Sequence, residues 1–162
     1  MRKVIFLDRD GVINMERGTY TFLPEHFEYT PNFWQNCKQM QSWGYDFIII
    51  TNQGGIAKKL YGKKEVELLN DKILQDAKAH GVQILAIYYC PHHNEIESCY
   101  CRKPNNLMLE KACAKYDVDK QQSYFIGDSQ RDIDAAKKTE ITGILIPKNV
   151  SLTSIFDRIA HG

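Results

Sequence analysis

Two acidic residues at the end of an apolar stretch are the first feature of this chain that could do chemistry. Asp8 and Asp10 directly follow the apolar residues 4–7, and Gly11 stands behind them. Carboxylates this close repel one another and are costly to remove from water unless a cation or strong hydrogen-bond donors meet them. Their spacing suits one carboxylate as a nucleophile or metal ligand and the other as a general acid and base. The alternative is an ordinary polar strand end.

A third acidic residue, Asp128, follows another apolar stretch, in the segment 127–132 with the sequence GDSQRD. Beside Asp8, it would complete an oxygen-rich site of the kind that Mg²⁺ prefers. Asp132 lies about one helical turn further along and could point toward the same ion or its waters. Because aspartate is also a common helix N-cap, the alternative here is a purely structural role.

Two further segments carry groups that could hold phosphate oxygens. Thr51, Asn52 and Gln53 open a glycine-rich turn, where a hydroxyl and free backbone N–H groups suit an anion. Lys103, which follows Arg102, could neutralise a phosphate or the clustered acids. The alternatives are a helix cap or turn for the first segment and a solvent-exposed ion pair for the second.

A dense group of sulfur and nitrogen ligands lies in residues 90–101, with the sequence CPHHNEIESCYC. Disulfides are disfavoured in a cytosolic chain, so three cysteines with a histidine at this spacing predict a tetrahedral Zn²⁺ site. Four protein ligands leave no open coordination position, which indicates a structural zinc rather than a catalytic one. The alternative is a set of free thiols.

A fold must bring these groups together, and the apolar pattern predicts one. Five buried strands are predicted, at 4–7, 46–50, 83–89, 123–126 and 142–147. Apolar residues at helical spacing predict intervening helices around 33–40, 66–77, 109–116 and 133–136. Strands that alternate with helices form a parallel sheet with helices on both faces, and ligands bind beyond the carboxyl ends of its strands.

Size and composition limit the class of protein. The chain has 162 residues, of which 43% are hydrophobic and 25% charged, so residues 1–162 are predicted to form one globular domain. A formal net charge of +1 gives no reason to expect nucleic acid or an acidic membrane as a partner. No apolar stretch approaches the roughly 20 residues of a membrane span, and we expect no signal peptide before the first strand. We expect a cytoplasmic protein that acts as a monomer.

Together, the motifs resemble those of the haloacid dehalogenase superfamily of phosphohydrolases. The motif residues, in order over nearly the whole chain, are DRDGV at 8–12, Thr51-Asn52, Lys103 and Gly127-Asp128. The resemblance implies a Rossmann-like, three-layer α/β/α fold whose parallel sheet has the order 5-4-1-2-3. That order sets Asp8 beside Asp128. The segments after the first and third strands are too short to fold into a cap domain with a core of its own.

The resemblance also implies a role for each acidic motif residue. Asp8 would be the nucleophile, and Asp10 would be the general acid and then the general base. The ligands of Mg²⁺ would be Asp8, the backbone carbonyl of Asp10, and Asp128.

For the substrate, the resemblance implies that Thr51 and Lys103 hold the reacting phosphate. Asn52, Gln53 and Arg102 are the further residues predicted to bind phosphate or substrate. We expect a small phosphorylated metabolite as the substrate.

The cysteine-rich loop narrows the resemblance to the zinc-containing heptose bisphosphate phosphatases and the related histidinol-phosphate phosphatases. The pattern in these families, Cys-x-His and then Cys-x-Cys, implies that the zinc ligands are Cys90, His92, Cys99 and Cys101. GVIN, TNQGGIAKK and YYCPHH favour the heptose enzymes, which remove the 7-phosphate in the synthesis of lipopolysaccharide or S-layer precursors. The short span between His92 and Cys99 favours the histidinol enzymes.

Three departures from the family pattern border the substrate rather than the reacting phosphate. Ser129 stands where both families have a cation, residues 105–107 are Asn-Asn-Leu, and the Gly-Tyr of the first loop is interrupted by Thr19. The predicted function is hydrolysis of heptose 1,7-bisphosphate, with histidinol phosphate as the alternative substrate. A non-catalytic phosphate sensor is a remote alternative, because it predicts damage at Asp8 or Asp10 and both are intact.

Overall fold

The computed structural model describes residues 1–159, in which strands alternate with helices as predicted. The strands are β1 (Lys3–Leu7), β2 (Tyr45–Asn52), β3 (Ile84–Cys90), β4 (Tyr124–Gly127) and β5 (Thr142–Leu145). The α-helices are α1 (Phe33–Ser42), α2 (Lys63–Ala79), α3 (Leu107–Tyr116) and α4 (Gln130–Lys138). Three 3₁₀ segments are η1 (Pro24–His26), η2 (Lys120–Gln122) and η3 (Leu152–Arg158). The predicted domain runs to residue 162, and its last three residues lie outside the described part of the chain.

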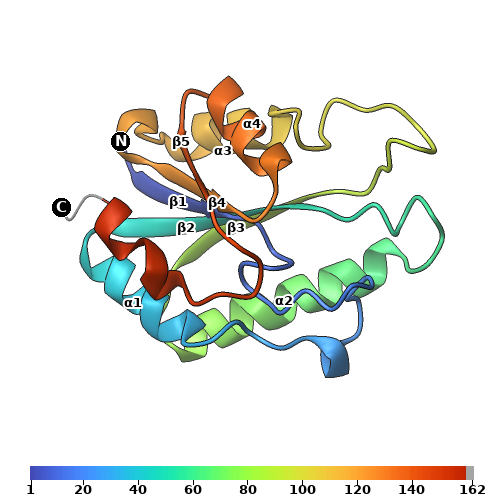
Figure 1. Ribbon diagram of the computed structural model, residues 1–162, viewed down its shortest axis with the longest axis horizontal. Coiled ribbons are helices and arrows are strands. Elements are labelled where there is room, and N and C mark those ends of the chain that lie inside the picture. The colour runs from blue at the N-terminus through green and yellow to red at the C-terminus, as the bar shows by residue number, and fades with distance from the viewer. Residues whose placement is uncertain (160–162) are drawn as a thin grey trace.

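The five strands form one parallel sheet of order β3-β2-β1-β4-β5, which confirms the predicted fold. The central strand, β1, pairs with β2 on one side and β4 on the other. Leu7 is level with Ile49 of β2 and with Ile126 of β4. The residues that follow these strands therefore emerge together at one end of the sheet (Figure 1).

Residues along β1 alternate between two cores, one on each face of the sheet. Ile5 and Leu7 pack in the core that includes residues of α1, α2 and η3, whereas Val4 and Phe6 pack in the core with residues of α3 and α4. In Figure 1, α1 and α2 accordingly lie on one side of the sheet and α3 and α4 on the other. All four side chains are fully buried, and each such burial stabilises the fold by about 1.5–3 kcal/mol. The strand that leads to the first two acids is thus held on both faces and by both neighbouring strands.

The prediction that all five strands are buried is wrong for β3 and β5. Six of the seven residues of β3 are only partly buried, and both end residues of β5, Thr142 and Leu145, are exposed. These two strands lie at the edges of the sheet, where a strand pairs on one side only. Short apolar stretches look alike in a central and an edge strand, so the sequence pattern does not separate them.

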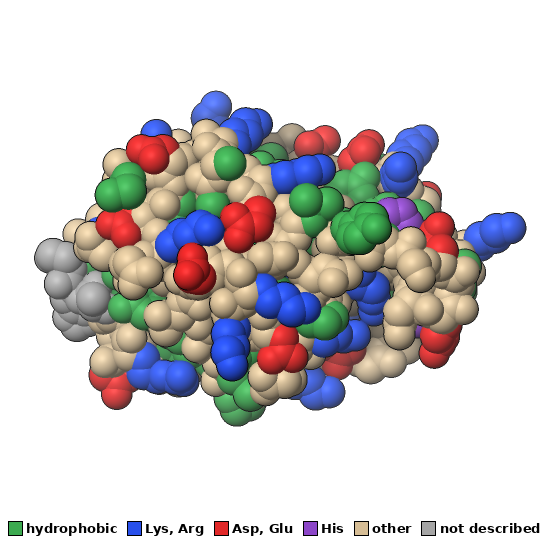
Figure 2. All heavy atoms as spheres, turned by 90° about the horizontal axis from the view of Figure 1, so that it is seen from above, with side chains coloured by type: hydrophobic (Ala, Val, Ile, Leu, Met, Phe, Trp, Pro, Cys, Tyr) green, Lys and Arg blue, Asp and Glu red, His purple; other side chains and the backbone are tan. Residues whose placement is uncertain are grey.

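No cap domain covers the strand ends in residues 1–159. The segments between β1 and α1 and between β3 and α3 contain no further strand or α-helix there, only η1. No helix within the described residues is long and apolar enough to cross a membrane. On the side where α3 and α4 lie, Figure 2 shows positive and negative side chains interspersed over the surface.

Candidate active site and metal centre

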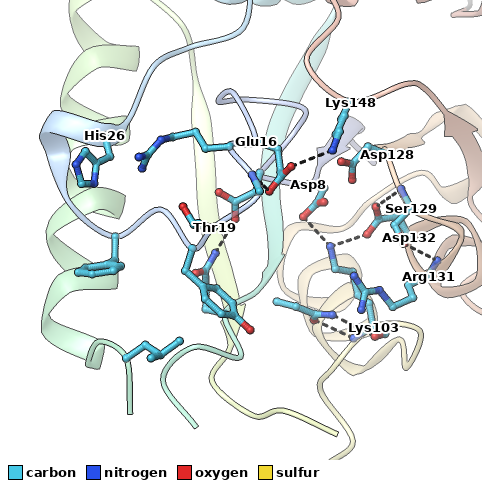
Figure 3. A pocket seen from close by; sticks show the side chains of 18 residues that line it. Asp8, Glu16, Thr19, His26, Lys103, Asp128, Ser129, Arg131, Asp132 and Lys148 are labelled. Atoms are coloured by element: carbon cyan, nitrogen blue, oxygen red, sulfur yellow. Dashed lines mark hydrogen bonds and ion pairs between the residues drawn. The ribbon is translucent and has the colours of Figure 1, made fainter. Parts of the chain in front are cut away.

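A cavity of about 980 Å³ opens at the carboxyl ends of the central strands, where the acidic motif residues meet (Figure 3). Asp8 and Asp10 reach it from the end of β1, and Asp128 from the end of β4. The loop 16–22 lines the cavity along one side, and residues at the start of α4 line it along another. The strand ends therefore bring together the three acids that the sequence predicted to be neighbours.

Asp8 has the most perturbed carboxyl group in the cavity. Lys103 Nζ donates to its Oδ1 at 2.9 Å, and the backbone N–H of Arg9 donates to the same oxygen at 2.9 Å. Burial raises the pKa of Asp8 to about 8, because Lys103 opposes the rise only in part and the carboxylates of Asp132 and Asp128 add to it. A cluster of acids with this electrostatics favours binding of a further cation.

Asp8, Asp128 and Asp132 each offer a carboxylate oxygen, and the three oxygens lie within 4.8 Å of one another. Gly11 makes room for this group, because a Cβ at that position would lie 2.1 Å from Asp128 Oδ2. Its φ of +89° is also one that glycine adopts without strain. A set of hard carboxylate oxygens is what Mg²⁺ prefers, so the residues present fit this ion. The Asp10 carboxylate is not part of the group.

Lys103 is buried between two of these carboxylates, with 2% of its surface exposed. Its Nζ lies 2.9 Å from Asp8 Oδ1 and 2.6 Å from Asp132 Oδ1. Burial acts to lower the pKa of Lys103, but Asp8 and Asp132 outweigh it, so the pKa is raised. The alternative of a solvent-exposed ion pair is therefore wrong, and Lys103 is a permanent cation at the floor of the cavity.

Asn52 lines the cavity and also fixes the backbone of Lys103. Its Nδ2 donates to the carbonyl oxygen of Lys103 at 3.1 Å, and the Lys103 N–H donates to its Oδ1 at 3.0 Å. The carbonyl of Ile50 also accepts from Lys103 Nζ at 2.9 Å. The end of β2 thus positions the lysine, and this role of Asn52 could not be foreseen because its partner is 51 residues away.

Asp10 accepts hydrogen bonds from three side chains. Arg9 Nη2 and Asn14 Nδ2 donate to its Oδ1 at 3.1 and 3.0 Å, and Gln53 Nε2 donates to its Oδ2 at 3.2 Å. Arg9 and Asn14 are fully buried, and Arg9 Nη2 also donates to the Thr21 carbonyl at 2.7 Å. Sequence reasoning missed both as site residues, although a charged residue between the two acids and an amide residue four positions after Asp10 were a visible signal.

The other residues predicted to bind substrate differ in whether they line the large cavity. Gln53 lines the cavity, but Thr51 does not, since it is buried and its Oγ1 accepts from Gln53 Nε2 at 2.9 Å. Arg102 lines a second cavity of about 280 Å³, which shares Lys103 and Arg131 with the first. Its Nη1 donates to the backbone carbonyl of His92 at 3.0 Å. Their predicted contacts with substrate stay predictions.

The loop after β5 is hydrogen-bonded to the loop 16–22, which lines the cavity. The backbone N–H of Glu16 donates to Asn149 Oδ1 at 2.6 Å, and Asn149 Nδ2 donates to the Glu16 carbonyl at 3.0 Å. Lys148 Nζ lies 3.2 Å from Glu16 Oε2 and itself lines the cavity (Figure 3). Neither Lys148 nor Asn149 was predicted, because no motif covers this segment.

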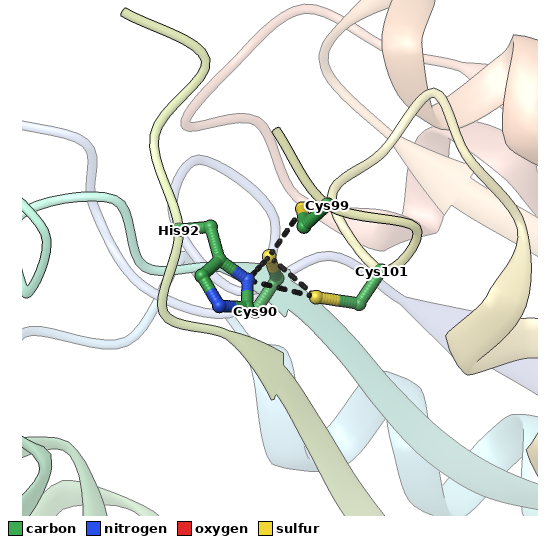
Figure 4. Close-up of side chains that lie close together, drawn as sticks. All are labelled: Cys90, His92, Cys99 and Cys101. Atoms are coloured by element: carbon green, nitrogen blue, oxygen red, sulfur yellow. Dashed lines mark hydrogen bonds between the residues drawn. The ribbon is translucent and has the colours of Figure 1, made fainter. Parts of the chain in front are cut away.

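The cysteine-rich loop gathers its four predicted ligands into one cluster (Figure 4). Cys90 Sγ lies 3.7 Å from Cys99 Sγ and 3.5 Å from His92 Nδ1. Cys101 Sγ is closer, at 2.9 Å from Cys90 Sγ and 3.2 Å from His92 Nδ1. Tetrahedral Zn²⁺ requires separations of about 3.8 Å between sulfurs and about 3.6 Å between sulfur and nitrogen, from its usual bond lengths. The cluster fits zinc with a small expansion at Cys101.

Hydrogen bonding within the cluster suits a thiolate at Cys99 in particular. The backbone N–H of Arg102 donates to Cys99 Sγ at 3.3 Å, and such donors outweigh burial and lower the pKa of Cys99. Burial raises the pKa of the Cys90 thiol. His93 lies outside the cluster, where its Nδ1 accepts from the Glu95 N–H at 3.2 Å. The candidate zinc ligands therefore include His92 and not His93, as the family pattern implied.

Comparison with known proteins gives both sequence and structural relatives. The family model described as "HAD-hyrolase-like" matches residues 100–160. The chain is 42% identical over 158 residues to the D-glycero-alpha-D-manno-heptose-1,7-bisphosphate 7-phosphatase of Photorhabdus laumondii, covering 94% of this chain and 86% of that protein. It is 33% identical to the D-glycero-beta-D-manno-heptose-1,7-bisphosphate 7-phosphatase of Pasteurella multocida, covering 91% and 83%.

The chain belongs to the D,D-heptose 1,7-bisphosphate phosphatase family. A solved family member, the enzyme of B. bronchiseptica complexed with magnesium and phosphate, has a TM-score of 0.81 and 31% identity to this chain. The match covers 88% of this chain and 79% of that one. Family membership confirms the predicted resemblance to the haloacid dehalogenase superfamily. It also shows that GVIN, TNQGGIAKK and YYCPHH were a better guide to the family than the short span between the zinc ligands.

Proposed function

We propose that this protein is a Mg²⁺-dependent phosphatase that removes the 7-phosphate from D-glycero-D-manno-heptose 1,7-bisphosphate through a phosphoryl-enzyme on Asp8. The observation that carries the proposal is the arrangement at the end of β1. Asp8 lies 2.9 Å from the buried Lys103 and beside Asp128, with Asp10 oriented two residues further on. The names of the relatives supply the substrate class.

In the first half of the reaction, an Asp8 carboxylate oxygen attacks the phosphorus of the 7-phosphate. The bond from phosphorus to the sugar oxygen breaks, and that oxygen takes a proton from Asp10. In the second half, Asp10 takes a proton from water, which attacks the aspartyl-phosphate and releases inorganic phosphate. Asp8 is then restored as a carboxylate and Asp10 as an acid, so the cycle balances.

Two charges assist this transfer without changing covalently. Lys103, held by Asp8 and Asp132, neutralises the phosphate where it meets the buried carboxylates. Mg²⁺, which Asp8, the Asp10 backbone carbonyl and Asp128 would hold, supplies further positive charge at the transferring phosphoryl group.

Recognition of the rest of the substrate is assigned to loops, because no cap domain contributes among the described residues. Arg17 to Tyr20 line the large cavity, and Thr51, Gln53 and Arg102 complete the predicted set. Ser129 caps α4, where its Oγ accepts from the Arg131 N–H at 3.3 Å. Its hydroxyl carries no charge, so this position provides no cation for a second phosphate. We therefore expect weaker binding of the distal phosphate than a lysine at position 129 would give.

The four-ligand cluster is proposed to hold a structural Zn²⁺. Its ligands are Cys90, His92, Cys99 and Cys101. A zinc at this point orders the segment that leads into Arg102 and Lys103, because so short a loop buries little apolar surface of its own. We propose that the enzyme acts as a monomer in the cytoplasm.

The test is a comparison of kcat/KM for both anomers of the heptose bisphosphate and for histidinol phosphate, at one Mg²⁺ concentration, with Asp8→Asn as the blank. We expect a heptose bisphosphate to be preferred, and the anomer preference decides which group of relatives this enzyme joins. A tenfold preference for histidinol phosphate, about 1.4 kcal/mol of transition-state binding, would overturn the substrate assignment. Failure to hydrolyse any phosphate monoester would instead favour a phosphate sensor.

A further inference from the structure

The Gln53 amide is oriented by a tyrosine that no motif contains. Tyr61 Oη donates to Gln53 Oε1 at 2.7 Å, while Gln53 Nε2 donates to Asp10 Oδ2 at 3.2 Å and to Thr51 Oγ1 at 2.9 Å. Gln53 is 2% exposed and Tyr61 is 8% exposed, so water hardly competes for these bonds. The result is a continuous path of hydrogen bonds from Tyr61 to the carboxylate of Asp10.

The two ends of a glutamine amide are nearly equal in shape, but only the NH₂ end can donate to a carboxylate. If the carbonyl end faced Asp10, two acceptors would oppose each other in a buried place. The Tyr61 hydroxyl gives the carbonyl end a donor on the far side of Gln53. Burial raises the pKa of Tyr61 to about 12, so the hydroxyl keeps its proton and remains a donor near neutral pH.

The glycine-rich turn explains how Tyr61 reaches this position. A Cβ on Gly55 would lie 2.1 Å from Cε1 of the Tyr61 ring, so only glycine leaves room for the ring there. The ring then stacks on Phe22, with centroids 4.9 Å apart and planes at 14°, and lies 5.9 Å from the ring of Tyr20. Phe22 and Tyr20 line the large cavity. Tyr61 is not among the residues that line this cavity.

We propose that Tyr61 is a positioning residue for Asp10, acting through the side-chain amide of Gln53. This inference rests on the proposed function, in which Asp10 gives a proton to the leaving sugar oxygen. Because that oxygen would leave as a strongly basic alkoxide, its departure depends on a well-placed acid. Nitrophenolate is a far weaker base and leaves without a proton, so p-nitrophenyl phosphate does not depend on Asp10 for formation of the phosphoryl-enzyme.

The test is Tyr61→Phe, which removes the hydroxyl but keeps the ring that stacks on Phe22. The matched control is Tyr116→Phe, which loses a tyrosine hydrogen bond of 3.1 Å to the Leu85 carbonyl, at the amino end of β3. We expect Tyr61→Phe to lower kcat/KM for the heptose bisphosphate about three- to tenfold, as loss of one neutral hydrogen bond does. For p-nitrophenyl phosphate, kcat/KM should stay within about twofold of wild type, because this ratio covers only steps through release of nitrophenolate.

Two further measurements sharpen the test. Hydrolysis of the phosphoryl-enzyme needs Asp10 as a base for either substrate, so Tyr61→Phe should show a larger burst of nitrophenolate before the steady state than wild type. Gln53→Glu, which sets a carboxylate against Asp10, should lower kcat/KM for the heptose bisphosphate more than Tyr61→Phe does. Thermal unfolding of Tyr61→Phe and Tyr116→Phe shows whether either variant is destabilised.

An equal fall for both substrates would mean a merely structural role for Tyr61, and no fall with the heptose bisphosphate would mean no role at all. Either outcome overturns the inference while the proposed function stands. If wild type hydrolyses another alkyl phosphate and not the heptose bisphosphate, the substrate assignment fails. The kcat/KM of Tyr61→Phe is then compared with that of wild type for that alkyl phosphate and for p-nitrophenyl phosphate. If wild type hydrolyses no phosphate monoester, both proposals fall.

Discussion

The acidic floor of the cavity and the cysteine-rich loop are two metal-binding regions built in opposite ways. The floor draws Asp8, Lys103 and Asp128 from distant parts of the sequence, and buried strands hold them in place. The loop draws four ligands from residues 90–101, and residues 94–98 between them are exposed. The core positions the first set of ligands, whereas we expect a metal to order the largely exposed loop that carries the second.

Lys103 connects the two regions, so the contacts that hold it determine whether disorder in the cysteine-rich loop can reach the acidic floor. Its backbone follows the last cysteine of the loop, but Asn52 binds that backbone on both sides. Its ammonium group is bound to Asp8 and Asp132. We therefore expect the floor to survive loss of order in the loop, and the following experiments test that separation.

The largest effect is expected at the floor. Asp8→Asn removes the nucleophile and should abolish turnover of every phosphate monoester. Zinc content should stay at about one ion per chain, because the loop does not depend on Asp8. Steady-state assays and elemental analysis of the same preparation measure both quantities. Activity close to that of wild type would refute covalent catalysis by Asp8.

Asp10→Asn should have the next largest effect. It leaves the nucleophile in place and removes the proton donor, which should lower kcat about 10²–10⁴-fold for an alkyl phosphate. The KM should change little, since the substrate's phosphate is held elsewhere. A kcat within a factor of ten of wild type would assign the acid to another group.

Cys99→Ser tests the loop and should be milder. The variant should lose zinc, bind substrate more weakly and have a lower Tm. For a chain of this size, each loss of about 1 kcal/mol in the free energy of unfolding lowers the Tm by about 2–4 °C. Its kcat should fall far less than that of Asp10→Asn, because Asn52 still holds Lys103. Cys113→Ala, at a buried cysteine outside the cluster, is the control and should retain zinc. A collapse of kcat in Cys99→Ser would show that the regions are not separable.

The last effect concerns stability, rather than turnover, as a function of pH. Burial raises the pKa of Asp8 from 3.8 to about 8, so in Mg²⁺-free buffer the folded chain binds a proton that the unfolded chain has released. The free energy of unfolding should therefore fall as pH rises from about 4 to about 8. The raised pKa of Lys103 leaves that residue charged over the whole interval.

Calorimetry of wild type and Asp8→Asn at pH 5 and pH 8 measures this effect. The variant should gain in Tm relative to wild type as the pH rises, and added Mg²⁺ should reduce the gain by stabilising wild type. Zinc should remain bound throughout, since removal of Mg²⁺ by dialysis does not open a four-ligand site. A pH-independent difference between the two proteins would mean that Asp8 is ionised in the folded state without a metal.

The family resemblance that the strand-end motifs carry was sufficient for the sheet order and for the meeting of Asp8 with Asp128. The family pattern also selected the four residues that cluster in the cysteine-rich loop, all of which lie within one short segment. Sequence reasoning failed where a role depends on a distant partner. The role of Asn52 in clamping Lys103 was not foreseen, and Tyr61 and Asn149 carry no motif at all. The partial exposure of β3 was missed, because an apolar pattern does not separate a central strand from an edge strand.

The central place of β1 in the sheet has a consequence for the order in which the protein forms. β1 pairs with β4, and the Val4 N–H donates to Ser123 Oγ at 2.9 Å across 119 residues of sequence. A ribosome-bound chain that stops before residue 124 already holds Asp8 and all four cysteine-loop ligands, but neither Asp128 nor Asp132. Closing so long a loop is slow and comes late, so zinc uptake should precede the ability to use Mg²⁺ during refolding. The nascent chain would carry its nucleophile in an inert form until the last strands arrive.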